Sequence, residues 1–115
     1  MARDQKCRKI CCIPKNKVFV PEHKQVGTVV LTLDEIEAVR LSDLEGLDQD
    51  TCAKRMEISR ATYQRILRSA RKAVADALVN GKAIEMRGGR YTVADNHCQG
   101  ETSCANCRFA EKKKG

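Results

Sequence analysis

Aromatic residues are scarce in this sequence: it has no tryptophan, and two tyrosines and two phenylalanines occur among 115 residues. Proteins that hold single-stranded nucleic acid stack its bases on aromatic side chains, so this scarcity argues against that class. Long apolar runs are also missing, because no stretch approaches the roughly 18 consecutive apolar residues of a membrane-spanning helix. The stretch from Met1 to Lys9 lacks the apolar segment of a signal peptide. We therefore expect a cytoplasmic protein with no membrane partner.

Catalytic patterns are missing as well. The sequence contains no glycine-rich phosphate loop, no nucleophile motif and no acidic pair in a setting that would activate it. We therefore expect a protein that binds a partner and is not an enzyme.

Positive charge, in contrast, is abundant. Lysine and arginine total 22 against 15 acidic residues, which gives a net charge of +7. Such an excess favours a polyanionic partner, and DNA, RNA and anionic membrane surfaces all satisfy it. The length suits one domain with a single modest core.

The chain divides into three parts. Residues 1–27 are basic, hold both prolines and show no apolar periodicity, so we expect an irregular arm that does not form the core. Residues 28–93 carry the periodic apolar pattern of a folded domain. Residues 94–115 are expected to form a flexible tail that contains cysteines.

The first expected helix begins near Leu33. Thr32 and Glu35 have the spacing of a capping box, in which each side chain accepts a hydrogen bond from the other residue's backbone amide. Gly46 supplies the residue that best tolerates the left-handed conformation after a helix end.

Two further helices follow. Asp48 is a suitable N-cap for a short helix to about Met56, and Ser59 is one for a long helix that ends at Asn80 and Gly81. The apolar residues of the long helix recur at intervals of three and four. They are Tyr63, Ile66, Leu67, Ala70, Val74, Ala77 and Leu78.

The expected β structure is small. Val29–Leu31 form a short extended run, and Ile84–Met86 and Tyr91–Val93 flank Gly88 and Gly89, a pattern typical of a hairpin turn. The fold class is therefore mainly α, with three helices, a short β element and irregular ends that carry cysteines.

The segment from Gln49 to Arg68 has the pattern of a helix-turn-helix. This motif needs a small residue midway along its first helix, and Ala53 stands there. It also needs apolar residues at fixed offsets, which here are Cys52, Met56, Ile58, Tyr63 and Ile66. A plain helical hairpin can show the same spacing, so the charge pattern must decide between the two.

The third helix carries positive charges and no acidic residue before Asp76. A solvent-exposed face usually mixes charges of both signs, so charges of one sign favour a surface for DNA phosphates and base edges. The candidate DNA-binding residues are Ser59, Arg60, Ala61, Gln64, Arg65, Arg68, Arg71 and Lys72. The N-terminal part of a recognition helix meets the bases, which assigns Arg60, Ala61, Gln64 and Arg65 to base edges and the last three residues to phosphates.

Four segments together resemble a known family. They read CRKICCIP, LTLDEIEAVRLSDLEGLDQDTCAKRM, SRATYQRILRSARKAVADALVNGKAI and RGGRY. They are similar to the small prokaryotic proteins grouped as domain of unknown function 134, over roughly Ala2 to Tyr91. The resemblance implies a DNA-binding helix-turn-helix similar to the promoter-reading region of bacterial sigma factors, but no established function. The turn departs from the family, since Glu57 stands where glycine is typical.

Seven cysteines are present, and in the cytoplasm we expect them to stay reduced, which favours metal ligation or redox sensing over disulfides. Structural zinc generally takes four ligands, and an iron–sulfur cluster would use the same thiolates. The candidate ligands are Cys7, Cys11, Cys98, Cys104 and Cys107. Free thiols remain the alternative, and Cys52 is expected to pack in the core.

These patterns predict sequence-specific binding of double-stranded DNA in transcriptional regulation. A homodimer is expected, because one recognition helix contacts too few bases for the usual specificity. Two alternatives stay open: a metal- or redox-responsive regulator that uses the cysteines, and a protein-interaction adaptor that does not bind DNA.

Overall fold

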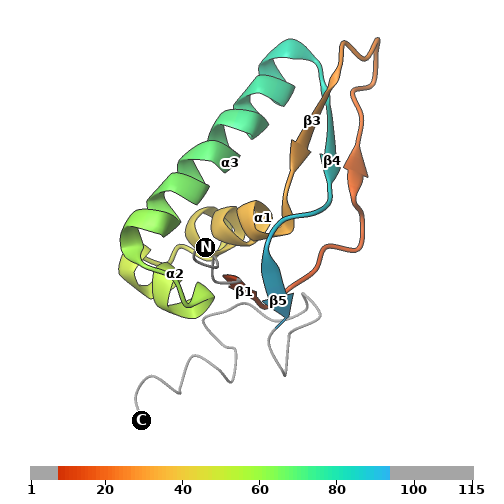
Figure 1. The fold of residues 1–115 in the computed structure, drawn as a ribbon. Coiled ribbons are helices and arrows are strands. Elements are labelled where there is room, and N and C mark those ends of the chain that lie inside the picture. Colours follow the sequence, from red (N-terminus) through yellow and green to blue (C-terminus); the bar gives the residue numbers. More distant parts are fainter. Residues whose placement is uncertain (1–7, 94–115) are drawn as a thin grey trace, which may run out of the picture.

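The structure is a computed structural model that describes residues 8–93, and in this part the protein is mainly α-helical with short strands. Figure 1 shows the long helix α3 beside a small sheet, with the two shorter helices near its N-terminal end. The helices are α1 (Leu33–Val39), α2 (Gln49–Met56) and α3 (Arg60–Asn80), and a π-helical segment, η1 (Arg40–Leu44), continues α1. The strands are β1 (Arg8–Ile10), β2 (Val18–Phe19), β3 (Thr28–Leu31), β4 (Ala83–Met86) and β5 (Tyr91–Val93).

All three helices begin where the capping residues predict. The expected capping box of Thr32 and Glu35 is present, and in it the Thr32 backbone amide donates to Glu35 Oε1 at 3.0 Å. Asp48 Oδ1 accepts from the Thr51 amide at 2.7 Å, and Ser59 Oγ accepts from the Thr62 amide at 3.1 Å. Each cap satisfies a backbone donor that has no partner within its helix.

The core lies where α3 crosses α1 and α2. One cluster of buried side chains joins these helices: Ala38, Leu41, Cys52, Ala53, Met56, Tyr63, Ile66 and Leu67. The apolar face of α3 extends less far than its sequence suggests. The prediction that Leu78 belongs to this face is wrong, because Leu78 is 75% exposed. The last turns of α3 run beyond α1 and α2 and lie beside β3 and β4 (Figure 1).

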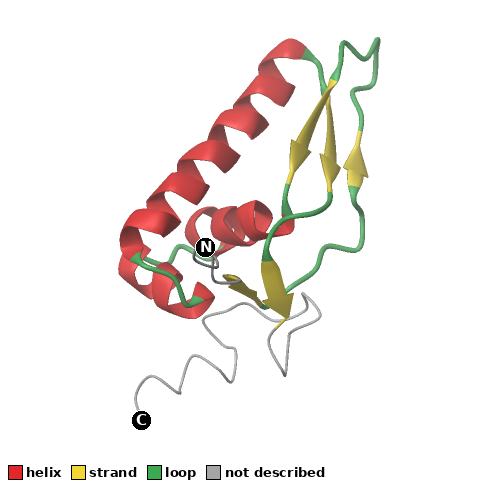
Figure 2. Cartoon of the chain, in the orientation of Figure 1, coloured by secondary structure: helices red, strands yellow, loops and turns green. Residues whose placement is uncertain are grey.

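Strand β4 is the centre of a three-stranded sheet, which Figure 2 shows beside α3. It pairs antiparallel with β2 and parallel with β3. The prediction of a hairpin between residues 84–86 and 91–93 is therefore wrong. Both edges of β4 are already taken, so the chain turns away through Gly88 and Gly89 and β5 pairs parallel with β1.

The N-terminal arm is more ordered than predicted. Within the range 1–27, the expectation of irregular structure is wrong for Arg8–Ile10 and Val18–Phe19, which form β1 and β2. Ile10 is 1% exposed, and β1 packs against α1 and α2, so the arm contributes to the core. The expected flexible tail, residues 94–115, lies outside the described residues. Within residues 8–93 no helix is long and apolar enough to cross a membrane.

The two glycines after β4 differ in what surrounds them. Gly88 has a φ of 76° and open space where a Cβ would stand, whereas Gly89 has a φ of 104° and faces other atoms. A Cβ on Gly89 would lie 2.8 Å from Thr32 Cβ and would also collide with Asp34 Oδ1.

Replacing each glycine by alanine separates these effects. We expect Gly88→Ala to lower the free energy of unfolding by about 1–2 kcal/mol, because only the left-handed backbone is strained. Gly89→Ala should lower the free energy of unfolding by about 1–3 kcal/mol more, because the added methyl group also overpacks the start of α1. Urea denaturation of both variants measures the difference. Equal losses would contradict this description of the turn.

Candidate nucleic-acid interface

A three-residue connection, Glu57 to Ser59, joins α2 to α3. Glu57 adopts the left-handed conformation, with φ 59° and ψ 45°. The Ile58 amide donates to the Ala53 carbonyl at 3.0 Å, which closes the end of α2. The tight turn therefore uses a non-glycine residue in a conformation that costs on the order of 1 kcal/mol.

Glu57 has a partner that sequence reasoning missed. Lys9 Nζ of β1 lies 3.1 Å from Glu57 Oε2, and both side chains are partly exposed. An exposed ion pair of this kind contributes up to about 1 kcal/mol, so it offsets part of the backbone strain. Lys9 lies here because β1 pairs with β5 and packs against α2, and no local sequence signal indicates this contact.

Most residues at the predicted helix-turn-helix offsets lie inside. Cys52, Ala53, Met56, Tyr63 and Ile66 are buried, whereas Ile58 is only partly buried and packs against this cluster. Burial raises the pKa of the Cys52 thiol, whose Sγ donates to the Leu47 carbonyl at 3.5 Å. Cys52 is therefore a neutral packing residue, as its position on the helix predicted.

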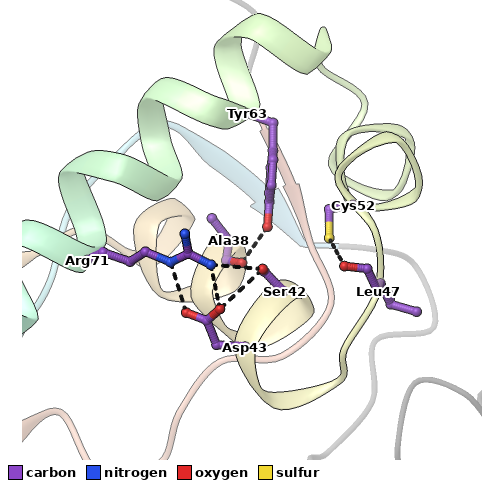
Figure 3. A network of polar contacts seen from close by, with 7 residues as sticks. All are labelled: Ala38, Ser42, Asp43, Leu47, Cys52, Tyr63 and Arg71. Atoms are coloured by element: carbon purple, nitrogen blue, oxygen red, sulfur yellow. Dashed lines mark hydrogen bonds and ion pairs between the residues drawn. The ribbon is translucent and has the colours of Figure 1, made fainter.

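Tyr63 holds α3 against α1. Its hydroxyl donates to the Ala38 carbonyl at 2.6 Å in a buried site, which Figure 3 shows. Burial also raises the pKa of Tyr63 far above its usual value, so the hydroxyl keeps the proton that it donates. With this face of α3 fixed inward, the opposite face must point outward.

Every predicted DNA-binding residue is accessible at the surface of α3 or at its N-cap. All are exposed: Ser59, Arg60, Ala61, Gln64, Arg65, Arg68, Arg71 and Lys72. Gln64 Nε2 donates to Gln49 Oε1 at 2.7 Å, so the two amides link α3 to the start of α2. Beside them lies a hollow of about 320 Å³ lined by Gln49, Gln64, Leu67, Arg68 and Arg71.

Two of the arginines are paired with aspartates from earlier elements. Arg60 Nη1 lies 3.4 Å from Asp50 Oδ1 of α2. Arg71 contacts Asp43 of η1 through Nη2 at 2.7 Å and through Nε at 3.2 Å (Figure 3). From Arg60 to Lys72 the charges on α3 all have one sign, but the surrounding surface also carries aspartates from η1 and α2. The sequence of α3 alone does not indicate these pairs, because both aspartates belong to other elements.

The other cations of the predicted DNA-binding surface differ from Arg60 and Arg71. Arg65 Nη2 donates to Thr62 Oγ1 at 3.3 Å, within its own helix. Within residues 8–93, no carboxylate lies within ion-pair distance of Arg65, Arg68 or Lys72. Together with the amide of Gln64, they form a surface that can hold a polyanion and hydrogen-bond to it.

The predicted metal ligands fall mostly outside the described part. Cys7, Cys98, Cys104 and Cys107 are not among residues 8–93, and that segment contains no group of three side chains able to hold a metal. Cys11 lies at the end of β1, where its backbone amide donates to Glu37 Oε2 at 3.0 Å. The expectation that the cysteines stay reduced is wrong for Cys12, which is disulfide-bonded.

Comparisons with known proteins identify a family whose description states no function. The family model described as "Protein of unknown function DUF134" matches residues 1–94. A UPF0251 protein of Clostridium novyi (strain NT) is 49% identical over 93% of this chain and 72% of its own length. UPF0251 proteins of Caldicellulosiruptor bescii and Ruminiclostridium cellulolyticum are 47% and 46% identical over 93% of this chain, and over 74% and 88% of their own lengths. No solved structure matches.

The turn offers a test of the two opposed contributions at Glu57. We expect Glu57→Gly to raise the free energy of unfolding by about 0.5 kcal/mol, because relief of about 1 kcal/mol of strain exceeds the lost ion pair. In a Lys9→Ala background the gain should grow to about 1 kcal/mol, since no pair remains to be lost. Glu57→Gln keeps the Cβ and its strain but loses the ion pair, so it should only lower the free energy of unfolding. Urea denaturation reports all four variants, and a clear loss of stability in Glu57→Gly would contradict the account.

Proposed function

This chain belongs to the family of proteins of unknown function DUF134, and since its relatives' names state no activity, we propose a function from its own surface. The protein binds double-stranded DNA sequence-specifically and acts as a transcriptional regulator, not as an enzyme. The observation that carries the proposal is the exposed face of α3, where cations and one amide stand opposite a buried apolar face.

The arrangement of α2 and α3 fits a helix-turn-helix. In this motif the second helix enters the major groove and its N-terminal residues contact base edges. Arg60, Gln64 and Arg65 occupy that part of α3 and are exposed. Arginine matches the two acceptors of guanine, and glutamine matches the donor and acceptor of adenine. Ala61 is small enough to contact a thymine methyl group.

Residues further along α3 suit the phosphate backbone. Arg68 and Lys72 are exposed, and Arg71 borders the hollow beside Gln64. Phosphate contacts fix the register of a protein on the duplex and carry most of the sequence-independent affinity. Base contacts and phosphate contacts would therefore lie in succession along one helix.

A duplex suits this surface better than a single strand. Single-strand binding needs exposed aromatic platforms, whereas Tyr63, the only aromatic residue of α3, is fully buried. A duplex also explains the homodimer that we propose, because two recognition helices would read two half-sites. If the protein were instead a protein-interaction adaptor, its binding would not depend on a duplex.

Control by the cysteines is a second candidate, favoured by contacts of the arm. Lys9 pairs with Glu57 in the turn, and Cys11 is held by the buried carboxylate of Glu37. A change at the cysteines that moved β1 would therefore act on the turn before α3.

Metal content tests this candidate. If zinc or an iron–sulfur cluster binds to Cys7, Cys11, Cys98, Cys104 and Cys107 once the disulfide of Cys12 is reduced, protein purified anaerobically under reducing conditions should carry metal, and chelation should change its affinity for DNA. Elemental analysis and DNA titration with and without chelator measure both effects. The variant with Cys104 and Cys107 both changed to serine is the control, and protein that takes up neither zinc nor iron would refute metal control.

DNA binding itself is tested by alanine variants and by salt. Affinity for duplex DNA should fall steeply as salt rises, because bound phosphates release counterions. Arg68→Ala and Lys72→Ala should weaken binding to all sequences alike and reduce the salt slope by about 1 each. Gln64→Ala and Arg65→Ala should cost about 1–3 kcal/mol only on a duplex selected by the wild-type protein.

Fluorescence anisotropy with a selected and a randomised duplex measures these effects. Equal losses on both duplexes for all four variants would contradict the orientation of α3. Binding that does not depend on salt would contradict DNA binding through this surface.

A further inference from the structure

Arg71 of α3 makes a contact through two of its nitrogens with one of the protein's own carboxylates. Asp43 Oδ1 accepts from Arg71 Nη2 at 2.7 Å, and Asp43 Oδ2 accepts from Arg71 Nε at 3.2 Å. Ser42 Oγ accepts a further bond from Arg71 Nη2 at 3.3 Å and donates to Asp43 Oδ1 at 3.2 Å, as Figure 3 shows. One edge of the guanidinium group, formed by Nε and Nη2, is thus occupied.

A carboxylate and a phosphate use an arginine fork in the same way. Both accept two parallel N–H bonds from the planar guanidinium group. While Asp43 holds Nε and Nη2, those donors are not available to a phosphate oxygen of DNA. The hydrogen bond from Arg71 also lowers the pKa of Asp43, so this carboxylate remains charged at neutral pH.

The ion pair of Arg71 and Asp43 is exposed enough for Arg71 to exchange Asp43 for another anion. The side chains of Arg71 and Asp43 are 53% and 41% exposed, whereas those of Arg40 and Glu37 are 13% and 3% exposed. An exposed ion pair is worth at most about a factor of five in an equilibrium constant, because water and salt screen it. A buried pair is costly to break, since it would leave an uncompensated charge. Arg71 can therefore leave its aspartate, and Arg40 cannot.

We propose that Asp43 is an internal competitor of phosphate for Arg71, which keeps the sequence-independent affinity for DNA low. The inference rests on the proposed function and adds to it a residue that sets affinity. The competition acts on a phosphate contact, so it weakens binding to every sequence by the same factor. Asp50 would compete less strongly with phosphate for Arg60, because it makes a single contact to Arg60 at 3.4 Å.

The decisive variant is Asp43→Asn, which removes the charge and keeps the size of the side chain. We expect it to bind a fluorescein-labelled duplex of randomised sequence about two- to fivefold more tightly, with a salt slope steeper by about 0.9 for one added phosphate. A duplex selected by the wild-type protein should gain the same factor. Fluorescence anisotropy over a range of salt concentrations measures both.

Asp76→Asn is the matched control, because Asp76 lies near the far end of α3 and pairs with Lys82 at 2.9 Å. It makes the same change of net charge away from the hollow. A second control is Arg71→Gln, alone and combined with Asp43→Asn. The gain from Asp43→Asn should disappear when Arg71 is absent.

Three results would overturn the inference. Equal gains in Asp43→Asn and Asp76→Asn would mean that only net charge matters, and a gain that persists without Arg71 would mean that the pair is irrelevant. A loss of affinity in Asp43→Asn would mean that Asp43 positions Arg71 for DNA. If the wild-type protein binds neither duplex at any salt concentration, the proposed function fails and this inference with it.

Discussion

The hydrogen bond from the Tyr63 hydroxyl to the Ala38 carbonyl is the contact on which the proposed interface depends most. It is buried and 2.6 Å long, and it lies where α1 gives way to the π-helical segment η1. Tyr63 is fully buried among side chains from α1 and α2, so it fixes the rotation of α3 about its axis. This rotation puts Gln64, Arg65 and Arg68 outward. A helix turned by one residue would bury charges that have no partners there, which is prohibitively costly.

Local signals were sufficient to predict the helices. Thr32, Asp48 and Ser59 each mark a helix start, and Gly81 follows the end of α3 in the left-handed conformation. These signals act through backbone groups a few residues away, so a single sequence contains all the information needed. The spacing of apolar residues in the same helices also predicts which side chains are buried around Ala53 and Tyr63.

Contacts between distant segments could not be predicted in this way. The pairing of β1 with β5 joins residues 8–10 to 91–93, and it brings Lys9 to Glu57. The burial of Ile10 and the pairing of Asp43 with Arg71 have the same origin, since each joins segments that no local pattern relates. The exposure of Leu78 depends on where α1 and α2 end in space, whereas helical spacing predicts only which residues share a face.

The central claim is that the exposed face of α3 binds duplex DNA. Amide NMR spectra of labelled protein, titrated with a duplex of randomised sequence, test it most directly, because they locate the contact surface without any substitution. We expect the largest shifts between Ser59 and Lys72 and at Gln49, and we expect these shifts to weaken as salt rises. Shifts confined to the sheet formed by β2, β3 and β4 would contradict it, as would spectra that duplex DNA leaves unchanged.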